Sequence, residues 1–294
     1  MEQAITNGAK PKQSKIISLK NKFRLKRGAL VLPYFVLALI FVVTPLFILL
    51  VQAFISFDGG FTLSNITRVF TGGGLRLFLR SMYIAGVTTI ICLVIAYPVA
   101  LLLASKKIKV PLFIITLFIV PMLINVVIRT FALREIFLWI ERSITRSRGE
   151  PFSLHNDFKI IVALCLDYFP FMLLPIYTVL RSQDWTLLEA SSDLGASNIR
   201  TLTKVTFPLS IPGIISGITM VFMPAISNFA IPLIVIPVGD GSELLYGNRI
   251  WFMFGSRATY NQGAAYALFL LAVILVSFVL IAKLTKGKSK GLVF

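Results

Sequence analysis

The stretch SMYIAGVTTIICLVIAYPVALLLAS, residues 81–105, carries no charged side chain in 25 positions. A helix of about 20 apolar residues is long enough to cross the hydrocarbon core of a bilayer. A charge near the middle of such a helix costs roughly 2.5–3.5 kcal/mol. This stretch therefore predicts a membrane-spanning helix, and other parts of the chain repeat its pattern.

Charge-poor runs of membrane length predict six spans in an all-α membrane protein. They are expected at about residues 30–57, 80–105, 110–131, 159–180, 208–231 and 258–282. Together they form one transmembrane domain over residues 28–284, flanked by a basic cytoplasmic tail at 1–27 and a short cytoplasmic tail at 285–294. After about residue 230 the prolines predict irregular backbone, which must be sheltered by protein because lipid offers it no hydrogen bonds.

The composition excludes several classes of protein. Only 14% of the 294 residues are charged and 57% are hydrophobic, whereas soluble proteins contain about 25% charged residues. Soluble enzymes and nucleic-acid-binding modules are therefore excluded, despite the net charge of +17. The two cysteines, Cys92 and Cys165, lie in apolar runs and are expected to be buried and unpaired.

The distribution of charge predicts the orientation of the spans. With the N-terminus inside, the cytoplasmic segments carry a net charge of +14 and the remaining segments +3. Cytoplasmic loops of membrane proteins are enriched in Lys and Arg, so both termini are expected in the cytoplasm. Residues 133–148 would then lie outside and carry four arginines; their apolar residues recur at helical spacing, which predicts an amphipathic helix on the outer interface.

The chain contains no recognisable catalytic chemistry. Its single histidine, His155, lies in a polar loop, and no nucleotide-binding, metal-binding or nucleophile motif is present. We expect no catalytic residue, metal or cofactor in this chain. If the chain moves a solute, the energy must come from a partner or from an ion gradient.

The most informative connection is DWTLLEASSDLGASNIRTLTKVTFPLSIP, residues 184–212. It predicts two short helices, 186–194 and 197–206, joined at Gly195 in a left-handed conformation. Such an amphipathic hairpin either rests on lipid headgroups or enters a groove of a peripheral protein. Its acids Glu189 and Asp193 would be repelled by anionic lipid and favour the protein.

This stretch resembles the EAA loop of ATP-binding cassette importer permeases, whose pattern is E-A-A, three residues, G, nine residues, I-x-L-P. Here Glu189-Ala190-Ser191 is followed at the same intervals by Gly195 and by Val205-Thr206-Phe207-Pro208. The resemblance implies the six-helix type I (MetI-like) importer permease fold, with residues 184–207 as the loop that couples to the ATPase. The coupling residues implied are Glu189, Ala190, Ser191, Asp193, Gly195, Ala196 and Pro208.

The same resemblance implies partners and a location. A second permease subunit would complete a heterodimer, a dimer of cytoplasmic ATP-binding subunits would hold ATP and Mg, and an extracytoplasmic binding protein would deliver the substrate. The chain would be embedded in the lipid bilayer of a bacterial cytoplasmic membrane, with no nucleic-acid partner.

Further short matches resemble the spermidine/putrescine permeases, of the first of their two permease types. They are FTLSN at 61–65, YPVA at 97–100, IRT at 128–130, FPF at 169–171, LPIY at 174–177 and GNRI at 247–250. Permeases for iron, sulfate, thiamine or opines share much of this pattern and stay open as alternatives. An ion-coupled secondary transporter is disfavoured because the spans contain so few acids.

Polar residues inside the spans are the candidates for the substrate path, because they are costly in lipid and normally face the interior of the bundle. The carboxylate of Asp167 would either attract a passing polyamine or pair structurally with Arg129. The other candidates are Tyr168, Asn125, Tyr177, Ser227 and Asn228. Gly213 and Gly217, four residues apart, predict close helix packing instead.

Overall fold

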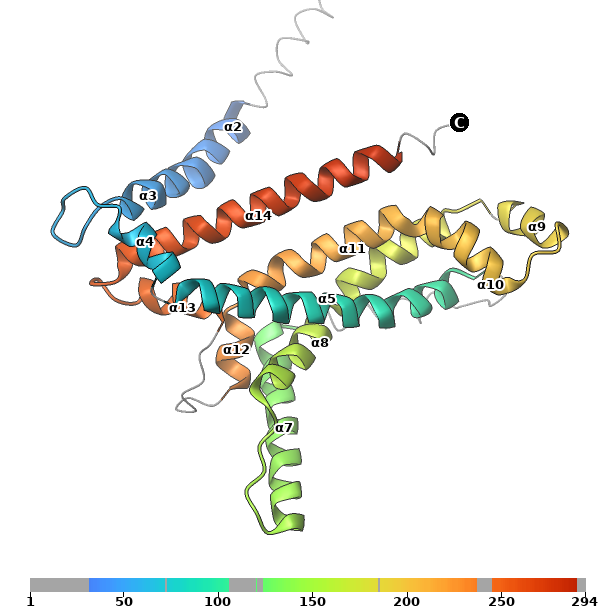
Figure 1. Ribbon diagram of the computed structural model, residues 1–294, viewed down its shortest axis with the longest axis horizontal. Coiled ribbons are helices and arrows are strands. Elements are labelled where there is room, and N and C mark those ends of the chain that lie inside the picture. Colours follow the sequence, from blue (N-terminus) through green and yellow to red (C-terminus); the bar gives the residue numbers. More distant parts are fainter. Residues whose placement is uncertain are drawn as a thin grey trace, which may run out of the picture. The chain divides into compact units, whose positions relative to one another are not determined.

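The computed structural model describes residues 32–71, 73–105, 120, 124–184, 186–236 and 245–289. The chain divides into two units, Met1–Gln52 and Ala53–Phe294. The described part is built from helices, as expected for an all-α protein (Figure 1). The helices are α2 (Leu32–Ala38), η1 (Leu39–Val43), α3 (Thr44–Ala53), α4 (Ser64–Thr71), α5 (Gly74–Ala104), α7 (Val126–Arg148), α8 (Asn156–Arg181), α9 (Thr186–Asp193), α10 (Asn198–Thr201), η2 (Leu202–Thr206), α11 (Phe207–Ser227), α12 (Ala230–Val235), α13 (Tyr246–Phe254) and α14 (Tyr260–Ser289).

Five stretches of the described chain are long and apolar enough to cross a membrane. They are Pro33–Ala53, Gly74–Ala104, Asn156–Arg181, Asn198–Ser227 and Tyr260–Ile281. They match five of the six expected spans and confirm an all-α membrane protein. Most of the third expected span, 110–131, lies outside the described residues.

The region around the third expected span differs from the prediction. Residues 126–131 do not end a separate span but form the first turns of α7, which continues without a break to Arg148. The helix begins where it does because the side chain of Asn125 accepts a hydrogen bond of 2.8 Å from the backbone N–H of Val127. No proline or glycine interrupts the sequence before Gly149, so the helix predicted for 133–148 simply starts earlier.

Three other helix boundaries differ from those predicted from the sequence. Helix α5 starts six residues before the expected residue 80. A helix need not end at the membrane surface, and the charge of Arg80 is neutralised within it by Asp157, 2.6 Å away. Helix α14 runs on to Ser289 through residues expected in the C-terminal tail, since lysine is a good helix former and no proline follows. After residue 230 the chain forms the short helix α12 instead of irregular backbone, and the expected shelter is present because its Ile231 and Val235 are buried.

Two turns of π-helix share one cause. Both η1 and η2 end two residues before a proline, Pro45 and Pro208. A proline in a helix lacks an N–H donor, and its ring clashes with the carbonyl four residues earlier. The wider π turn moves that carbonyl away and lets each helix continue through its proline.

The core of the unit Ala53–Phe294 is formed by α5, α8 and α11, with Cys92 and Met172 among its buried residues. A Cβ on Gly213 would lie 2.9 Å from the backbone oxygen of Pro175, and one on Gly217 would lie 2.7 Å from the sulfur of Met172. The predicted role of this glycine pair in close helix packing is confirmed. Both cysteines are free, as expected; Cys92 is buried and Cys165 is partly buried.

Candidate functional site

The hairpin of α9 and α10 lies at the end of α11 opposite α12 and α13 (Figure 1). Helix α9 ends in a Schellman motif, in which the N–H of Ala196 donates to the carbonyl of Ser191 at 3.1 Å. The N–H of Gly195 donates to the carbonyl of Ser192 at 2.9 Å. Gly195 has φ +76°, so the predicted left-handed turn is confirmed, and open space surrounds its Cα.

The two arms of the hairpin are joined by a side-chain hydrogen bond. The hydroxyls of Ser191 on α9 and Thr201 on α10 lie 2.9 Å apart. Ser191 stands where the EAA pattern has its second alanine, so this departure from the pattern supplies a local contact. The hydroxyl of Ser197 caps α10 by accepting from the N–H of Arg200 at 3.4 Å.

The tip of the hairpin is apolar and uncovered. Leu194 is 88% exposed, and Ile199 on the other arm is also exposed. The acids Glu189 and Asp193 face solvent beside them. Sequence reasoning missed Ile199, because an amphipathic pattern does not reveal which of its apolar residues a fold leaves uncovered.

The second arm of the hairpin is continuous with a predicted span. Helical backbone runs from Asn198 through α10, η2 and α11 to Ser227, a length of 30 residues. The sequence predicts a helix at 197–206 that ends before a span starting at Pro208, whereas the structure has one continuous helix through this proline. Because the π turn η2 accommodates the proline, Pro208 lies within a longer helix and does not separate the loop from the membrane.

A polar cluster lies among α7, α8 and α11. The carboxylate of Asp167 on α8 forms an ion pair with Arg129 on α7, which the sequence analysis named as one of two alternatives. The next residue, Tyr168, accepts a hydrogen bond of 2.9 Å from the side-chain amide of Asn228. Asn228 follows α11 directly, and its amide oxygen accepts from the N–H of Ile231 at 3.0 Å.

The other candidate path residues have local partners. Asn125 caps α7, and the hydroxyl of Ser227 donates to carbonyl oxygens of its own helix at 3.3 Å. Tyr177 is partly buried against the core cluster of α5, α8 and α11, nine residues after Tyr168. The structure thus brings together Asp167, Tyr168 and Asn228 from the predicted set.

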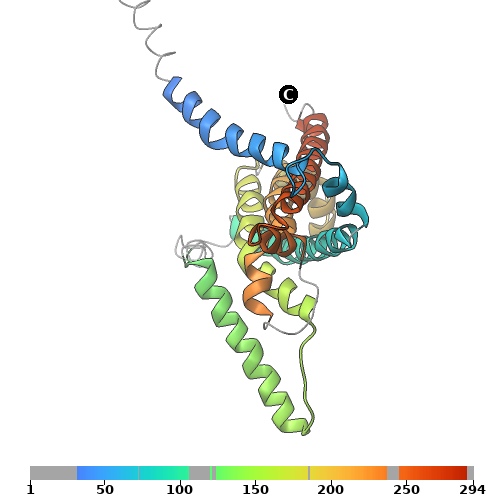
Figure 2. The ribbon, with the colours of Figure 1, turned by 90° about the vertical axis from the view of Figure 1, so that its left-hand side faces the viewer.

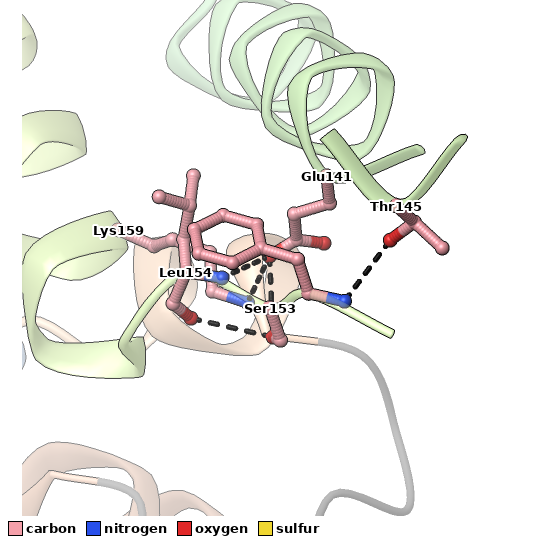
Figure 3. A network of polar contacts seen from close by, with 6 residues as sticks. Glu141, Thr145, Ser153, Leu154 and Lys159 are labelled. Atoms are coloured by element: carbon pink, nitrogen blue, oxygen red, sulfur yellow. Dashed lines mark hydrogen bonds and ion pairs between the residues drawn. The ribbon is translucent and has the colours of Figure 1, made fainter. Parts of the chain in front are cut away.

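A second polar network joins α7 to α8, and sequence reasoning did not find it. The carboxylate of Glu141 accepts from the backbone N–H of Leu154 at 2.8 Å, from the amine of Lys159 at 3.3 Å and from the hydroxyl of Ser153 at 3.3 Å (Figure 3). Lys159 is buried although it is charged. Nothing in the order of residues indicated that positions 18 apart would meet.

Within the described ranges, His, Cys, Asp and Glu side chains do not gather in groups of three that could hold a metal ion. The described chain instead offers membrane-length helices, an exposed helical hairpin and a polar cluster between helices. These features define a multi-pass, all-α membrane protein.

Comparison with known proteins identifies the family. No family model matches the chain. It is 33% identical over 224 residues to the spermidine/putrescine transport system permease protein PotB of Escherichia coli (strain K12), covering 73% of this chain and 79% of that protein. PotB of Haemophilus influenzae is 28% identical over 273 residues, covering 88% of this chain and 93% of that protein. The inner membrane ABC transporter permease protein YdcU of E. coli is 28% identical over 260 residues, or 79% of this chain and 80% of that protein.

The chain therefore belongs to the PotB family of transport-system permease proteins. The resemblance first noted in its short motifs is confirmed. Its relatives are named as permease proteins of transport systems, and this chain is a permease of the same kind.

Proposed function

We propose that this chain is a permease subunit of an ATP-binding cassette importer that carries polyamines, spermidine or putrescine, across the bacterial cytoplasmic membrane. It forms the path with a second permease subunit as a heterodimer, and both of its termini lie in the cytoplasm. The observation that carries this proposal is the unbroken helix Asn198–Ser227, which joins an exposed hairpin to the polar cluster.

The helix links the hairpin mechanically to the polar cluster. At 1.5 Å per residue its 30 residues measure roughly 45 Å, enough to reach from a cytoplasmic surface to the outer half of a bilayer. The hairpin at one end presents Leu194 and Ile199 to a groove on the ATP-binding subunit, while Asn228 at the other end bonds to Tyr168. Movement of the hairpin is thereby transmitted to the polar cluster.

ATP and Mg are bound and ATP is hydrolysed by a dimer of cytoplasmic ATP-binding subunits, and this chain holds neither. Glu189, Ala190, Ser191, Asp193, Gly195 and Ala196 contact that dimer. An extracytoplasmic binding protein delivers the polyamine to the outer side. The assignment of ATP hydrolysis to other subunits is supported by the lack of catalytic motifs in this sequence.

The substrate path runs beside Asp167, Tyr168 and Asn228, and continues past Asn125, Ser227 and Tyr177. In the conformation described, Arg129 neutralises Asp167. As the permease opens, Arg129 turns toward the water of the path and the ammonium groups of the polyamine take its place beside Asp167, so that the carboxylate attracts the cation only during transport and neither charge stays buried alone. A buried charge needs such a partner at every stage, because an uncompensated one is strongly unfavourable.

The coupling role is tested by replacing Gly195. A leucine at φ +76° costs roughly 1–2 kcal/mol and adds bulk at a tip that must enter a groove. Asparagine tolerates this conformation and serves as the matched control. We expect Gly195→Leu to remain inserted but to lose most co-purification with the ATP-binding subunit and at least about tenfold in polyamine uptake, while Gly195→Asn keeps both. Wild-type uptake by Gly195→Leu with the ATP-binding subunit still bound would refute coupling through this hairpin.

A further inference from the structure

The motif GNRI at residues 247–250 has no role in the proposed function. The structure places Gly247 and Asn248 in the first turn of α13, and both are buried. The short helix α12 lies beside α13 at this end of the bundle (Figures 1 and 2). Because buried polar side chains are hydrogen-bonded, the partners of Asn248 show what the motif holds in place.

Gly247 lies directly against a break in the helical backbone. Helix α11 ends at Ser227 and α12 begins at Ala230, so two residues lie between the helices. A Cβ on Gly247 would lie 2.6 Å from the carbonyl oxygen of Ser227 and 2.8 Å from that of Asn228. These are backbone atoms, which cannot move aside as the end of a flexible side chain can. The glycine therefore allows the first turn of α13 to touch the break.

Asn248 ties the break to α13 through its buried side chain. Its amide nitrogen donates to the carbonyl of Phe229, and its amide oxygen accepts from the N–H of Leu245 at 3.1 Å. Both ends of one amide are used, which fixes the orientation of the side chain. A buried donor without a partner is costly, so the bond to Phe229 should persist while α13 stays in place.

Helix α13 is itself anchored to two membrane-length helices. The N–H of Tyr246 donates to the hydroxyl of Ser81 on α5 at 2.8 Å. The hydroxyl of Tyr246 donates to the carbonyl of Tyr266 on α14 at 3.2 Å. All three residues are buried. The first turn of α13 is therefore a fixed support for the break.

The break contains Asn228, a member of the polar cluster. Its side chain donates to the hydroxyl of Tyr168 on α8 and accepts from the N–H of Ile231 in α12. Because it bonds to two different helices, its position depends on how the junction of α11 and α12 is held. Gly247 and Asn248 hold that junction from α13.

We infer that Asn248 is a positioning residue for the substrate path, which holds the junction of α11 and α12 so that the amide of Asn228 reaches Tyr168. Asn248 does not contact the polyamine, and Gly247 serves by letting α13 approach. This inference rests on the proposed function, because it needs Asn228 to line the path. Its distinguishing consequence is that loss of Asn248 changes transport only through Asn228.

A double-mutant cycle tests this dependence. Uptake of radiolabelled spermidine is measured per folded complex, with saturating loaded binding protein. Asn248→Ala and Asn228→Ala should each lower uptake about fivefold, the effect of one lost hydrogen bond, and the double variant should be no slower than the slower single one. Independent effects would multiply to about 25-fold, and that result would overturn the inference. Wild-type uptake by either single variant would also overturn it.

The matched control is Asn65→Ala. Asn65 is another buried asparagine, whose amide donates to the carbonyls of Ala53 and Ile55 at 3.2 and 2.9 Å, and these contacts lie outside the polar cluster. Its loss should lower the melting temperature of the complex, as Asn248→Ala does, but leave uptake per folded complex unchanged. An equal fall in uptake for both variants would show a general effect of stability and contradict the positioning role.

Two further outcomes are decisive. If Asn248→Ala gives too little folded complex, the cycle is run with Asn248→Ser, whose hydroxyl keeps a polar group at the buried position but is too short to reach Phe229. Failure of both variants to fold would show a purely structural role, and the inference would fall while the proposed function stands. Absence of spermidine uptake by the unmutated complex would refute the proposed function, and the inference with it.

Discussion

Replacing Asp167 by asparagine removes the charge that neutralises Arg129 while keeping the size of the side chain. The side chains of Asp167 and Arg129 are only 5% and 14% exposed, so water cannot compensate the arginine. Removing one partner of a buried ion pair costs about 3–5 kcal/mol. At 1.4 kcal/mol per tenfold this amounts to roughly a thousandfold in the folding equilibrium, which should appear as a low yield of folded protein.

The same substitution at a partly exposed ion pair, which water reaches, provides the control. Asp157 pairs with Arg80, and both side chains are 25% exposed. Pairs of this kind contribute about 0–1 kcal/mol. Asp157→Asn should therefore leave the folded yield close to that of the wild type.

The double variant Asp167→Asn with Arg129→Gln separates stability from transport. It removes both charges, so the folded yield should recover relative to the single variant. Uptake of radiolabelled spermidine is then measured per folded complex in vesicles. If Asp167 attracts the polycation on the path, uptake stays low in both variants, whereas full recovery of uptake in the double variant would show that Asp167 is only a structural partner and would refute its path role.

Two further predictions concern packing and topology. Gly213→Ala should lower the melting temperature of the purified protein, because the new Cβ would lie 2.9 Å from a backbone oxygen that cannot move aside. Gly86→Ala is the control, since open space surrounds that position, and it should be neutral or slightly stabilising. Equal shifts in melting temperature for the two variants would contradict this packing. A cysteine replacing exposed Ser192 in the hairpin should react only with thiol reagents that reach the cytoplasm, and one replacing exposed Ser147 on α7 only with reagents applied outside. Labelling of both from the same side would exclude the proposed orientation.

Periodicity and charge predicted the helical membrane fold because lipid allows few alternatives. In hydrocarbon each backbone polar group must be satisfied within its own segment, so a charge-free run such as residues 81–105 has to be a helix. The left-handed turn at Gly195 was equally predictable, since the capping chemistry of one short helix is local. The family resemblance followed from the same hairpin.

Helix boundaries were predicted less well, because they depend on interactions that a charge-based rule ignores. Spans were expected to start at Arg80 because of its charge and at Pro208 because of its proline, yet a salt bridge and a π turn let the helices pass through both positions. The start of α7 at Val126 likewise depends on a cap at Asn125 that a hydropathy pattern cannot resolve.

The sequence by itself determined the membrane class, the close-packed glycines, the hairpin and the family, because each depends on local composition or on residues near one another in the chain. Only the tertiary structure decided that Arg129 meets Asp167, that Asn228 meets Tyr168 and that Glu141 holds Lys159. These contacts join residues 18 to 60 positions apart, and which polar groups pair depends on how the helices cross. Helix crossing is set by side-chain packing over the whole bundle, which no single segment encodes.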